Sequence, residues 1–304
     1  MKRFSGVFTP IITPFRNDDT VDEPALRQNV AQWMETSLTG LVVLGSNGEA
    51  PQLSDAEADR IVDVVREGVP RNRPLIAGTG RESTRATIAA TRKAAAAGVD
   101  AVLVRTPSFF KAQMTTDVFV KHYASVADAS PVPVLLYNVS MFTGVNLPAD
   151  AVERLATHAN IVGLKESGSD IGLITEYVTR TPDDFTVLAG SATTFFQAMC
   201  AGCDGAILAL AAILPDACME IMQLVLDNRI ERARTLQQRV TPLAKSVGGT
   251  YGVPGLKAAL NLVGYQAGVP RPPLRSASPQ VIDIIRGQLE ALGLFKGLHA
   301  PSLN

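Results

Sequence analysis

Short apolar runs bounded by turn residues alternate along the chain with longer amphipathic stretches. A short apolar run predicts a buried strand, whereas apolar residues recurring every three or four positions predict a helix with one apolar face. The repetition of this pair predicts βα units, and therefore a parallel sheet with helices packed against it.

Eight such strands are predicted, spaced roughly 25 to 30 residues apart. They cover residues 6–12, 40–44, 74–78, 101–105, 132–137, 161–165, 186–188 and 205–208. The helices between them cover 24–35, 54–67, 83–98, 115–127, 148–157, 171–179 and 193–201. Eight βα units are enough to close a (β/α)8 TIM barrel, which is the predicted fold.

The predicted barrel occupies residues 1–228, and its last helix begins near Pro215. Residues 229–304 form a predicted C-terminal helical extension of two or three helices. Glycines near position 250 and a proline-rich stretch at 271–278 mark turns in this extension, but neither resembles an interdomain linker. We therefore expect the extension to pack on the barrel as part of a single structural unit.

The amino-acid composition limits the kinds of molecule that this protein is expected to bind. The chain has 304 residues, of which 46% are hydrophobic and 19% charged, with a formal net charge of -1. Without a basic run there is no electrostatic basis for binding nucleic acid or an anionic membrane. No apolar stretch is long enough to span a membrane, and the N-terminus lacks a signal-peptide pattern. We expect a cytoplasmic protein whose partner is a small molecule or another copy of itself.

The cysteines and histidines do not predict a metal or disulfide site. Cys200 and Cys203 form a C-x-x-C pair, but no second pair or suitably spaced histidine accompanies it. We interpret these two cysteines and Cys218 as small core residues, and a redox role for the pair is the alternative. The three histidines, His122, His158 and His299, are predicted to be surface or interface residues.

Lys165 closes the apolar run of the sixth predicted strand. In a barrel of this type the active site lies at the C-terminal ends of the strands, so this residue is predicted to face the barrel mouth. An ammonium group is costly to desolvate unless it is neutral or paired. Lys165 is therefore either a reactive amine or a solvated strand end, and the pattern alone leaves both open.

Two other strand ends carry candidate chemistry. The second predicted strand is followed by Gly45-Ser46-Asn47-Gly48-Glu49, whose backbone N–H groups and polar side chains can hold a carboxylate or phosphate. The same residue types also make ordinary turns. Tyr137 ends the fifth predicted strand and is either a proton-transfer group or a core aromatic with its hydroxyl at the rim.

In this order on eight βα units, the Gly-rich turn, the Tyr137-Asn138-Val139 turn and the Gly163-Leu164-Lys165-Glu166 strand resemble the N-acetylneuraminate lyase and dihydrodipicolinate synthase superfamily. The resemblance covers nearly the whole chain. It implies a metal-free class I aldolase or lyase that acts on pyruvate or another 2-oxo acid without a cofactor, and a homotetramer.

Carried over to this sequence, the resemblance makes Lys165 the imine-forming lysine and Tyr137 the residue that shuttles protons. A desolvated lysine can attack a carbonyl, and a protonated imine is an electron sink for C–C cleavage. Ser46 and Asn47 would bind the carboxylate of the 2-oxo acid. Further substrate-binding positions are Gly48, Gly190, Ile207, Phe110 and Phe142.

Two positions depart from the dihydrodipicolinate synthase pattern. Such synthases usually have an arginine after the Tyr-Asn-Val-Pro turn, whereas this chain has Phe142 there and Ser140 in place of the proline. They also usually have a tyrosine after strand four that completes a proton relay across a dimer, and Phe110 matches it here. A phenyl ring cannot relay a proton, so both departures argue against a role in lysine biosynthesis.

The segments Val126–Val134, Leu188–Ala192 and Tyr251–Lys257 look most like those of 4-hydroxy-2-oxoglutarate aldolases. The predicted reaction is therefore cleavage of 4-hydroxy-2-oxoglutarate to pyruvate and glyoxylate. The alternatives are dihydrodipicolinate synthase, which condenses pyruvate with aspartate semialdehyde, and a catalytically weakened 2-oxo-acid binding protein. An apolar set around Phe109 and Phe142 lines either a pocket for a less polar aldehyde or a dimer interface.

Overall fold

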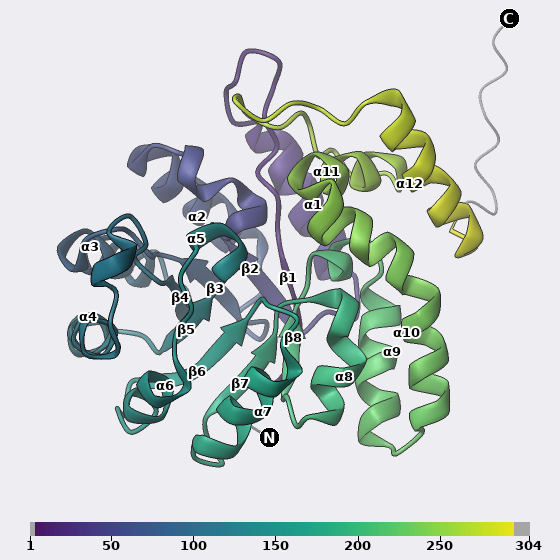
Figure 1. Ribbon diagram of the computed structural model, residues 1–304. Helices are drawn as coiled ribbons and strands as arrows, with labels where there is room; N and C mark the ends of the chain where they lie inside the picture. Colours follow the sequence, from purple (N-terminus) through teal and green to yellow (C-terminus); the bar gives the residue numbers. More distant parts are fainter. Residues whose placement is uncertain (1–3, 295–304) are drawn as a thin grey trace, which may run out of the picture.

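The computed structural model describes residues 4–294, which form a closed barrel of eight parallel strands (Figure 1). Each strand pairs with the next along the chain, and the last pairs with the first. The strands are β1 (Gly6–Pro10), β2 (Gly40–Val43), β3 (Leu75–Gly78), β4 (Ala101–Arg105), β5 (Val134–Asn138), β6 (Ile161–Glu166), β7 (Thr186–Ala189) and β8 (Gly205–Ile207). The predicted (β/α)8 fold is confirmed.

Helices surround the barrel and continue beyond it (Figure 1). Those that alternate with or follow the strands are α1 (Glu23–Met34), α2 (Asp55–Gly68), α3 (Thr84–Ala96), α4 (Thr116–Ala129), α5 (Ser140–Thr143), α6 (Ala149–Leu155), α7 (Ile171–Arg180), α8 (Phe195–Cys200) and α9 (Pro215–Leu226). The C-terminal helices are α10 (Ile230–Lys245), α11 (Gly252–Leu262) and α12 (Pro279–Ala291). Several predicted ends differ from these by one or two residues, because helix and strand ends fray.

Local capping explains where several helices begin. The Ser54 hydroxyl accepts a hydrogen bond from the Glu57 backbone N–H, and the Glu57 carboxylate accepts one from the Ser54 backbone N–H. This reciprocal pair fixes the start of α2, as the sequence predicts. Ser83 caps α3 in a similar way, and Gly98 follows that helix with a φ of +87°, a conformation that glycine adopts without strain.

The short helix α5 was not predicted. Its four residues are too few to show an apolar period, so the sequence offers no helical signal there. The helix ends at Gly144, which has a φ of +65°. It lies directly after β5, and therefore places Met141 and Phe142 at the C-terminal end of the barrel.

The apolar residues form two layers. A smaller cluster fills the barrel interior and includes Phe8, Leu103 and Leu135, with Tyr137 and Ile207 also in it. A larger cluster lies between the outer face of the sheet and the surrounding helices. The barrel is therefore a packed core with an open end, and polar side chains can gather at its mouth.

The C-terminal helices lie against one side of the barrel. Helix α10 packs along α9, and α11 packs against α12 (Figure 1). Between α10 and α11 the chain makes one π-helical turn, Ser246–Thr250. The proline-rich stretch that precedes α12 is attached to the barrel through Arg271, whose guanidinium contacts Glu57 at 2.6 Å.

The cysteine and histidine interpretations need correction at two positions. Cys203 and Cys218 are buried as expected, but Cys200 is exposed, because it ends the short helix α8 on its outer side. His122 is buried under neighbouring helices instead of lying at the surface. His158 lies 3.1 Å from Asp128 and is partly exposed. His299 falls outside the described residues.

Residues 4–294 lack two kinds of feature. No helix there is both long and apolar enough to cross a membrane. Within the same residues, no three or more His, Cys, Asp or Glu side chains are grouped so that they could hold a metal ion.

Candidate active site

A cavity of about 600 Å³ opens at the C-terminal ends of the strands. It is bordered by the turn after β2, by the ends of β5 to β8, and by the π-helical turn after α10. Seven of the nine predicted site residues line it: Ser46, Asn47, Tyr137, Phe142, Lys165, Gly190 and Ile207. Gly48 and Phe110 do not.

Lys165 and Tyr137 form the centre of the cavity wall. They are paired residues on the neighbouring strands β6 and β5, so both side chains point to the same side of the sheet. The Lys165 Nζ atom lies 3.5 Å from the Tyr137 hydroxyl oxygen and 4.5 Å from the centroid of its ring. Lys165 is only 5% exposed, and among residues 4–294 no carboxylate pairs with it. Of its two sequence-based interpretations, the solvated strand end is wrong.

The environment of Tyr137 lowers the pKa of its phenol. Burial alone opposes ionisation, but the positive charge of Lys165 and hydrogen bonds from Ser46, Ser167 and Lys165 outweigh it, so the Tyr137 pKa lies below its ordinary value. The Ser46 Oγ atom lies 3.3 Å from the phenol oxygen. Tyr137 can therefore accept a proton close to the Lys165 amine.

The turn that follows β2 is held in an unusual backbone conformation. Leu44 and Glu49 on either side of it both have a φ of +56°, which is uncommon for residues other than glycine. Gly48 belongs to the frame of this turn, since its carbonyl accepts a hydrogen bond of 2.7 Å from Thr13. Gly48 does not line the cavity, whereas Ser46 and Asn47 do, and the substrate-binding role of Gly48 stays a prediction.

Ser167 is a cavity residue that the sequence interpretation missed. It follows Lys165 and Glu166 directly, and its hydroxyl is one of the groups that hydrogen-bond Tyr137. Gly190 makes room for it: a Cβ atom at Gly190 would lie 2.2 Å from the Ser167 Oγ atom. The only available signal was a hydroxyl residue just beyond the predicted lysine strand.

Glu166 also lines the cavity, but its carboxylate is occupied by its own neighbours. It accepts hydrogen bonds from the Asn138 side chain and the Gly168 backbone N–H. Burial raises the pKa of the Glu166 carboxyl, and these hydrogen bonds only partly oppose the rise. Asn138 also accepts a hydrogen bond of 3.0 Å from the backbone N–H of Leu147. This network fixes the ends of β5 and β6, which carry Tyr137 and Lys165.

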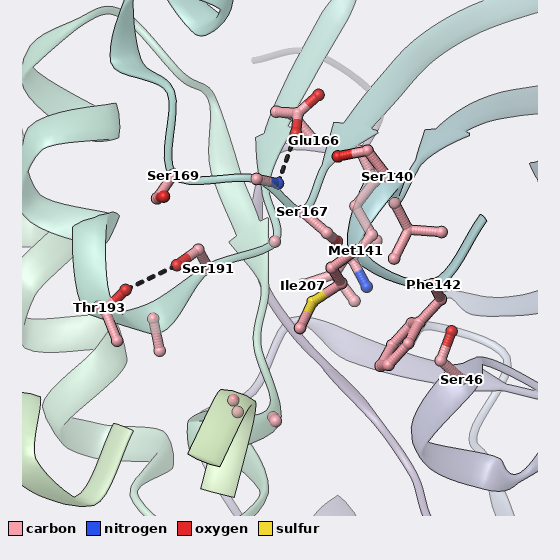
Figure 2. A pocket seen from close by; sticks show the side chains of 18 of the residues that line it. Ser46, Ser140, Met141, Phe142, Glu166, Ser167, Ser169, Ser191, Thr193 and Ile207 are labelled. Atoms are coloured by element: carbon pink, nitrogen blue, oxygen red, sulfur yellow. Dashed lines mark hydrogen bonds between the residues drawn. The ribbon is translucent and has the colours of Figure 1, made fainter. Parts of the chain in front are cut away.

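The cavity has two chemically different sides (Figure 2). Met141 and Phe142 lie on one side, with Ile207 near the middle, while Ser169, Ser191 and Thr193 lie on the other. The Ser191 and Thr193 hydroxyls are hydrogen-bonded at 2.9 Å. Figure 2 also shows the hydroxyl residues Ser46 and Ser140 on the side of Met141 and Phe142, so a ligand in this cavity would meet hydroxyl groups on both sides and large apolar side chains on one.

Phe110 lies elsewhere. It is 70% exposed on the loop after β4, where its ring meets that of Phe109 edge-on at 5.1 Å. The loop directs the ring outward, so Phe110 does not line the cavity of the single chain, and its substrate-binding role stays a prediction. Met141 and Phe142 are also largely exposed at the cavity rim.

A closed (β/α)8 barrel with a buried, unpaired lysine beside a tyrosine at its mouth has the architecture of a class I aldolase. The family model described as the Dihydrodipicolinate synthetase family matches residues 3–291. The chain therefore belongs to this family. Its members are carbon–carbon lyases, and the chain is accordingly a pyruvate-dependent class I aldolase in the broad sense.

Three similar proteins illustrate the relationship. The 4-hydroxy-tetrahydrodipicolinate synthase of Methanopyrus kandleri is 33% identical to this chain, and the match covers 96% of this chain and 98% of that protein. The 4-hydroxy-tetrahydrodipicolinate synthase of Thermotoga neapolitana is 34% identical, and the match covers 96% of this chain and 100% of that protein. The crystal structure of dihydrodipicolinate synthase from Thermotoga maritima superimposes with a TM-score of 0.91 at 31% identity, covering 96% of this chain and 99% of that one.

These names correct one part of the sequence interpretation. The superfamily was identified correctly, but the similar proteins are named as synthases and not as 4-hydroxy-2-oxoglutarate aldolases. The expectation of greatest similarity to the aldolases rested on a few short segments, whereas identity is counted over about 295 residues.

Proposed function

We propose that this enzyme cleaves a 4-hydroxy-2-oxo acid, with 4-hydroxy-2-oxoglutarate as the leading substrate, to pyruvate and an aldehyde through an imine on Lys165. The observation that supports this most strongly is the position of the Lys165 amine, which is buried and 3.5 Å from the Tyr137 hydroxyl. A buried amine without a carboxylate partner is suited to attack a carbonyl carbon.

Substrate binding begins at the turn after β2. The Ser46 hydroxyl and the Asn47 amide hold the 1-carboxylate of the 2-oxo acid, with backbone N–H groups of the turn as further donors. This places C2 beside Lys165. The amine attacks C2, water leaves, and a protonated imine forms in its place. No cofactor or metal is needed, since the iminium itself withdraws electrons.

Bond cleavage follows from the position of Tyr137. Its phenolate accepts the proton of the 4-hydroxyl, the C3–C4 bond breaks, and the bonding electrons move into the iminium to form an enamine. The C4 fragment leaves as an aldehyde, which is glyoxylate for 4-hydroxy-2-oxoglutarate. Ser46 and Ser167, which hydrogen-bond Tyr137, stabilise its charge before the transfer.

The remaining steps restore the enzyme. A proton adds to C3 of the enamine and regenerates an iminium, now of pyruvate. Water then attacks C2, pyruvate leaves, and the Lys165 amine is free again. The hydroxyls of Ser167 and Ser191 on the cavity wall are suited to hold this water and the departing aldehyde.

The second candidate is condensation of pyruvate with aspartate semialdehyde, and the names of the similar proteins favour it. It uses the same pyruvate enamine. Against it stand Phe142, at the position where such synthases usually carry an arginine, and the absence of any arginine among the described residues that line the cavity.

One experiment tests the shared chemistry and a second separates the candidates. Borohydride reduction with saturating pyruvate should leave a stable adduct on Lys165, located by peptide mass; an unmodified protein would exclude the imine. Purified enzyme is then given 4-hydroxy-2-oxoglutarate, or pyruvate with aspartate semialdehyde, in matched assays. The faster reaction identifies the function, and adduct formation with neither reaction would indicate a 2-oxo-acid binding protein.

The quaternary structure is a separate proposal. Four large apolar side chains are exposed: Phe109 and Phe110 on the loop after β4, and Met141 and Phe142 on α5, directly after β5. A group of exposed aromatic rings is typical of a protein interface. We expect a homo-oligomer, and a homotetramer in particular, which analytical ultracentrifugation would test.

A further inference from the structure

A second lysine, Lys245, lines the same cavity as Lys165. It ends helix α10, directly before the π-helical turn Ser246–Thr250. The residue therefore comes from the C-terminal extension and not from a barrel strand. Among the described residues that line the cavity, it and Lys165 are the two lysines, and no arginine accompanies them.

No acidic side chain among the described residues neutralises the charge of Lys245. Its side chain is exposed, and no carboxylate of residues 4–294 lies within salt-bridge distance. The two acidic residues of the cavity are engaged elsewhere: Glu166 binds Asn138 and Gly168, and Asp170 accepts a hydrogen bond of 3.1 Å from the Leu173 backbone N–H. An anion entering beside Lys245 would therefore meet an available cation.

The backbone next to Lys245 leaves space for a ligand. Gly248 and Gly249 both border the cavity, and a Cβ atom added at either would have no other atom within 4 Å. Both glycines are exposed, so the backbone leaves the rim of the cavity open here. A π-helical turn interrupting a helix is also common at functional sites. The open space at Gly248 and Gly249 and the ammonium group of Lys245 thus border the same part of the cavity.

We propose that Lys245 binds the distal carboxylate of a dicarboxylic substrate whose 2-oxo group reacts at Lys165. This inference rests on the proposed aldolase function and specifies its substrate as a 4-hydroxy-2-oxo dicarboxylate. Ser46 and Asn47 hold the first carboxylate, and Lys245 selects substrates with a second one. A cation there attracts a negatively charged aldehyde more than a neutral one.

A lysine in the last turn of a helix has an ordinary alternative role, which is to compensate the partial negative charge of the helix C-terminus. That role affects stability alone. Substrate preference therefore distinguishes substrate binding from compensation of the helix dipole. If Lys245 only compensated the dipole, its replacement would change kcat/KM for a dicarboxylate and for a monocarboxylate by the same factor.

The experiment compares kcat/KM for 4-hydroxy-2-oxoglutarate with kcat/KM for 4-hydroxy-2-oxopentanoate, in which a methyl group replaces the distal carboxylate. Lys245→Gln should lower the ratio of the two by about three- to tenfold at low salt, as expected for one partly solvated ion pair. Lys245→Arg, which keeps the charge, should retain most of the preference. Lys121→Gln, an exposed lysine on α4 outside the cavity, is the matched control and should leave the ratio unchanged.

The two hypotheses fail in different ways. If wild-type protein cleaves neither substrate, the proposed function is wrong, and the inference is then judged on borohydride trapping with 2-oxoglutarate against 2-oxobutanoate. In that assay Lys245→Gln should raise the half-saturating concentration of the dicarboxylate alone. An unchanged preference in Lys245→Gln, in turnover or in trapping, overturns the role of Lys245. Absence of any trapped adduct overturns both hypotheses.

Discussion

Two buried lysines in this protein have opposite surroundings. Lys257, on α11, is 1% exposed, and its Nζ atom lies 2.7 Å from a Glu49 carboxylate oxygen and within 2.8 Å of the carbonyl oxygens of Thr13 and Val269. Three acceptors match the three N–H groups of an ammonium. Lys165 is nearly as buried, but its hydrogen-bond partner among the described residues is the Tyr137 hydroxyl, at 3.5 Å.

The difference shows how one residue type serves structure in one place and chemistry in another. Burial lowers the pKa of the Lys257 amine, and the Glu49 carboxylate opposes that change. An ammonium with a complete set of acceptors has no lone pair available for a carbonyl. The Lys165 amine faces a cavity and lacks such acceptors, so a substrate carbonyl can reach it.

The largest effect should follow replacement of Lys165. Lys165→Met should lower kcat/KM by about 10⁴-fold or more, because the covalent intermediate can no longer form. It should not destabilise the protein, since an apolar side chain replaces a buried amine that has no carboxylate partner. Pyruvate release and thermal unfolding measure the two effects. A variant that unfolds readily would show that Lys165 has a structural role like that of Lys257.

Replacement of Tyr137 should separate imine formation from bond cleavage. Tyr137→Phe should still be trapped on Lys165 by borohydride with pyruvate, because its amine is intact. Turnover should fall by about 10²- to 10⁴-fold, since the 4-hydroxyl loses its proton acceptor. Equal loss of trapping and turnover would instead show that Tyr137 acts mainly by holding the lysine in place.

Replacement of Lys257 should affect stability more than chemistry. Lys257→Met leaves Glu49 as an unpaired buried carboxylate, which should lower the free energy of unfolding by about 3 to 5 kcal/mol. Denaturant unfolding measures this. In the double variant Glu49→Gln with Lys257→Met, most of the loss should be recovered, because no buried charge remains.

The same variant tests how the C-terminal extension supports the site. Glu49 ends the turn that carries Ser46 and Asn47, has a φ of +56°, and also accepts a hydrogen bond of 2.9 Å from the Arg271 backbone N–H. Loss of Lys257 should therefore raise the KM for the 2-oxo acid more than it lowers kcat. If both parameters stay unchanged in the folded variant, the turn does not depend on the ion pair.

Most of the fold could be predicted from local features of the sequence. The apolar runs, the Ser54 capping box and Gly98 after α3 are each encoded within a few neighbouring residues, so they predicted the barrel units directly. Lys165 and Tyr137 were recognisable because each ends an apolar run. What the sequence could not supply was their register, which depends on an irregularity between Val134 and Leu135 in the pairing of β5 with β6.

Contacts between distant segments account for the parts of the site that were missed. Lys257 lies more than 200 residues from Glu49, and nothing near either residue indicates the pair. Lys245 belongs to the C-terminal extension, far along the chain from Lys165, and no motif marks it in the sequence. Phe110 was placed by its position after a strand, but the path of the loop sends its ring into solvent. The path of each loop and the contacts between residues distant in the sequence thus determine which residues near the strand ends line the cavity.

His122 is a third buried base, and it lies outside the cavity. Its Nδ1 atom is 2.9 Å from the Thr84 hydroxyl, and its buried Nε2 atom has no hydrogen-bond partner among residues 4–294. Burial lowers the pKa of the His122 imidazole to about 4, a change that the Glu82 carboxylate only partly opposes. It therefore shows what burial does to a base when neither an ion pair nor catalysis is involved.

The smallest expected effect is the pH dependence that His122 contributes to the free energy of unfolding. Its pKa is lower in the folded chain than its ordinary value of 6.5, so the unfolded chain binds a proton first as the pH falls. The contribution of neutral His122 to the free energy of unfolding is fully present above pH 6.5 and is lost progressively as the pH falls to about 4. Between pH 7 and pH 4.5, wild type should lose about 2 to 3 kcal/mol more than His122→Gln, which keeps a polar partner for Thr84 without titrating. Urea unfolding at the two pH values measures this, and parallel losses in both proteins would show that His122 is protonated without penalty in the folded state.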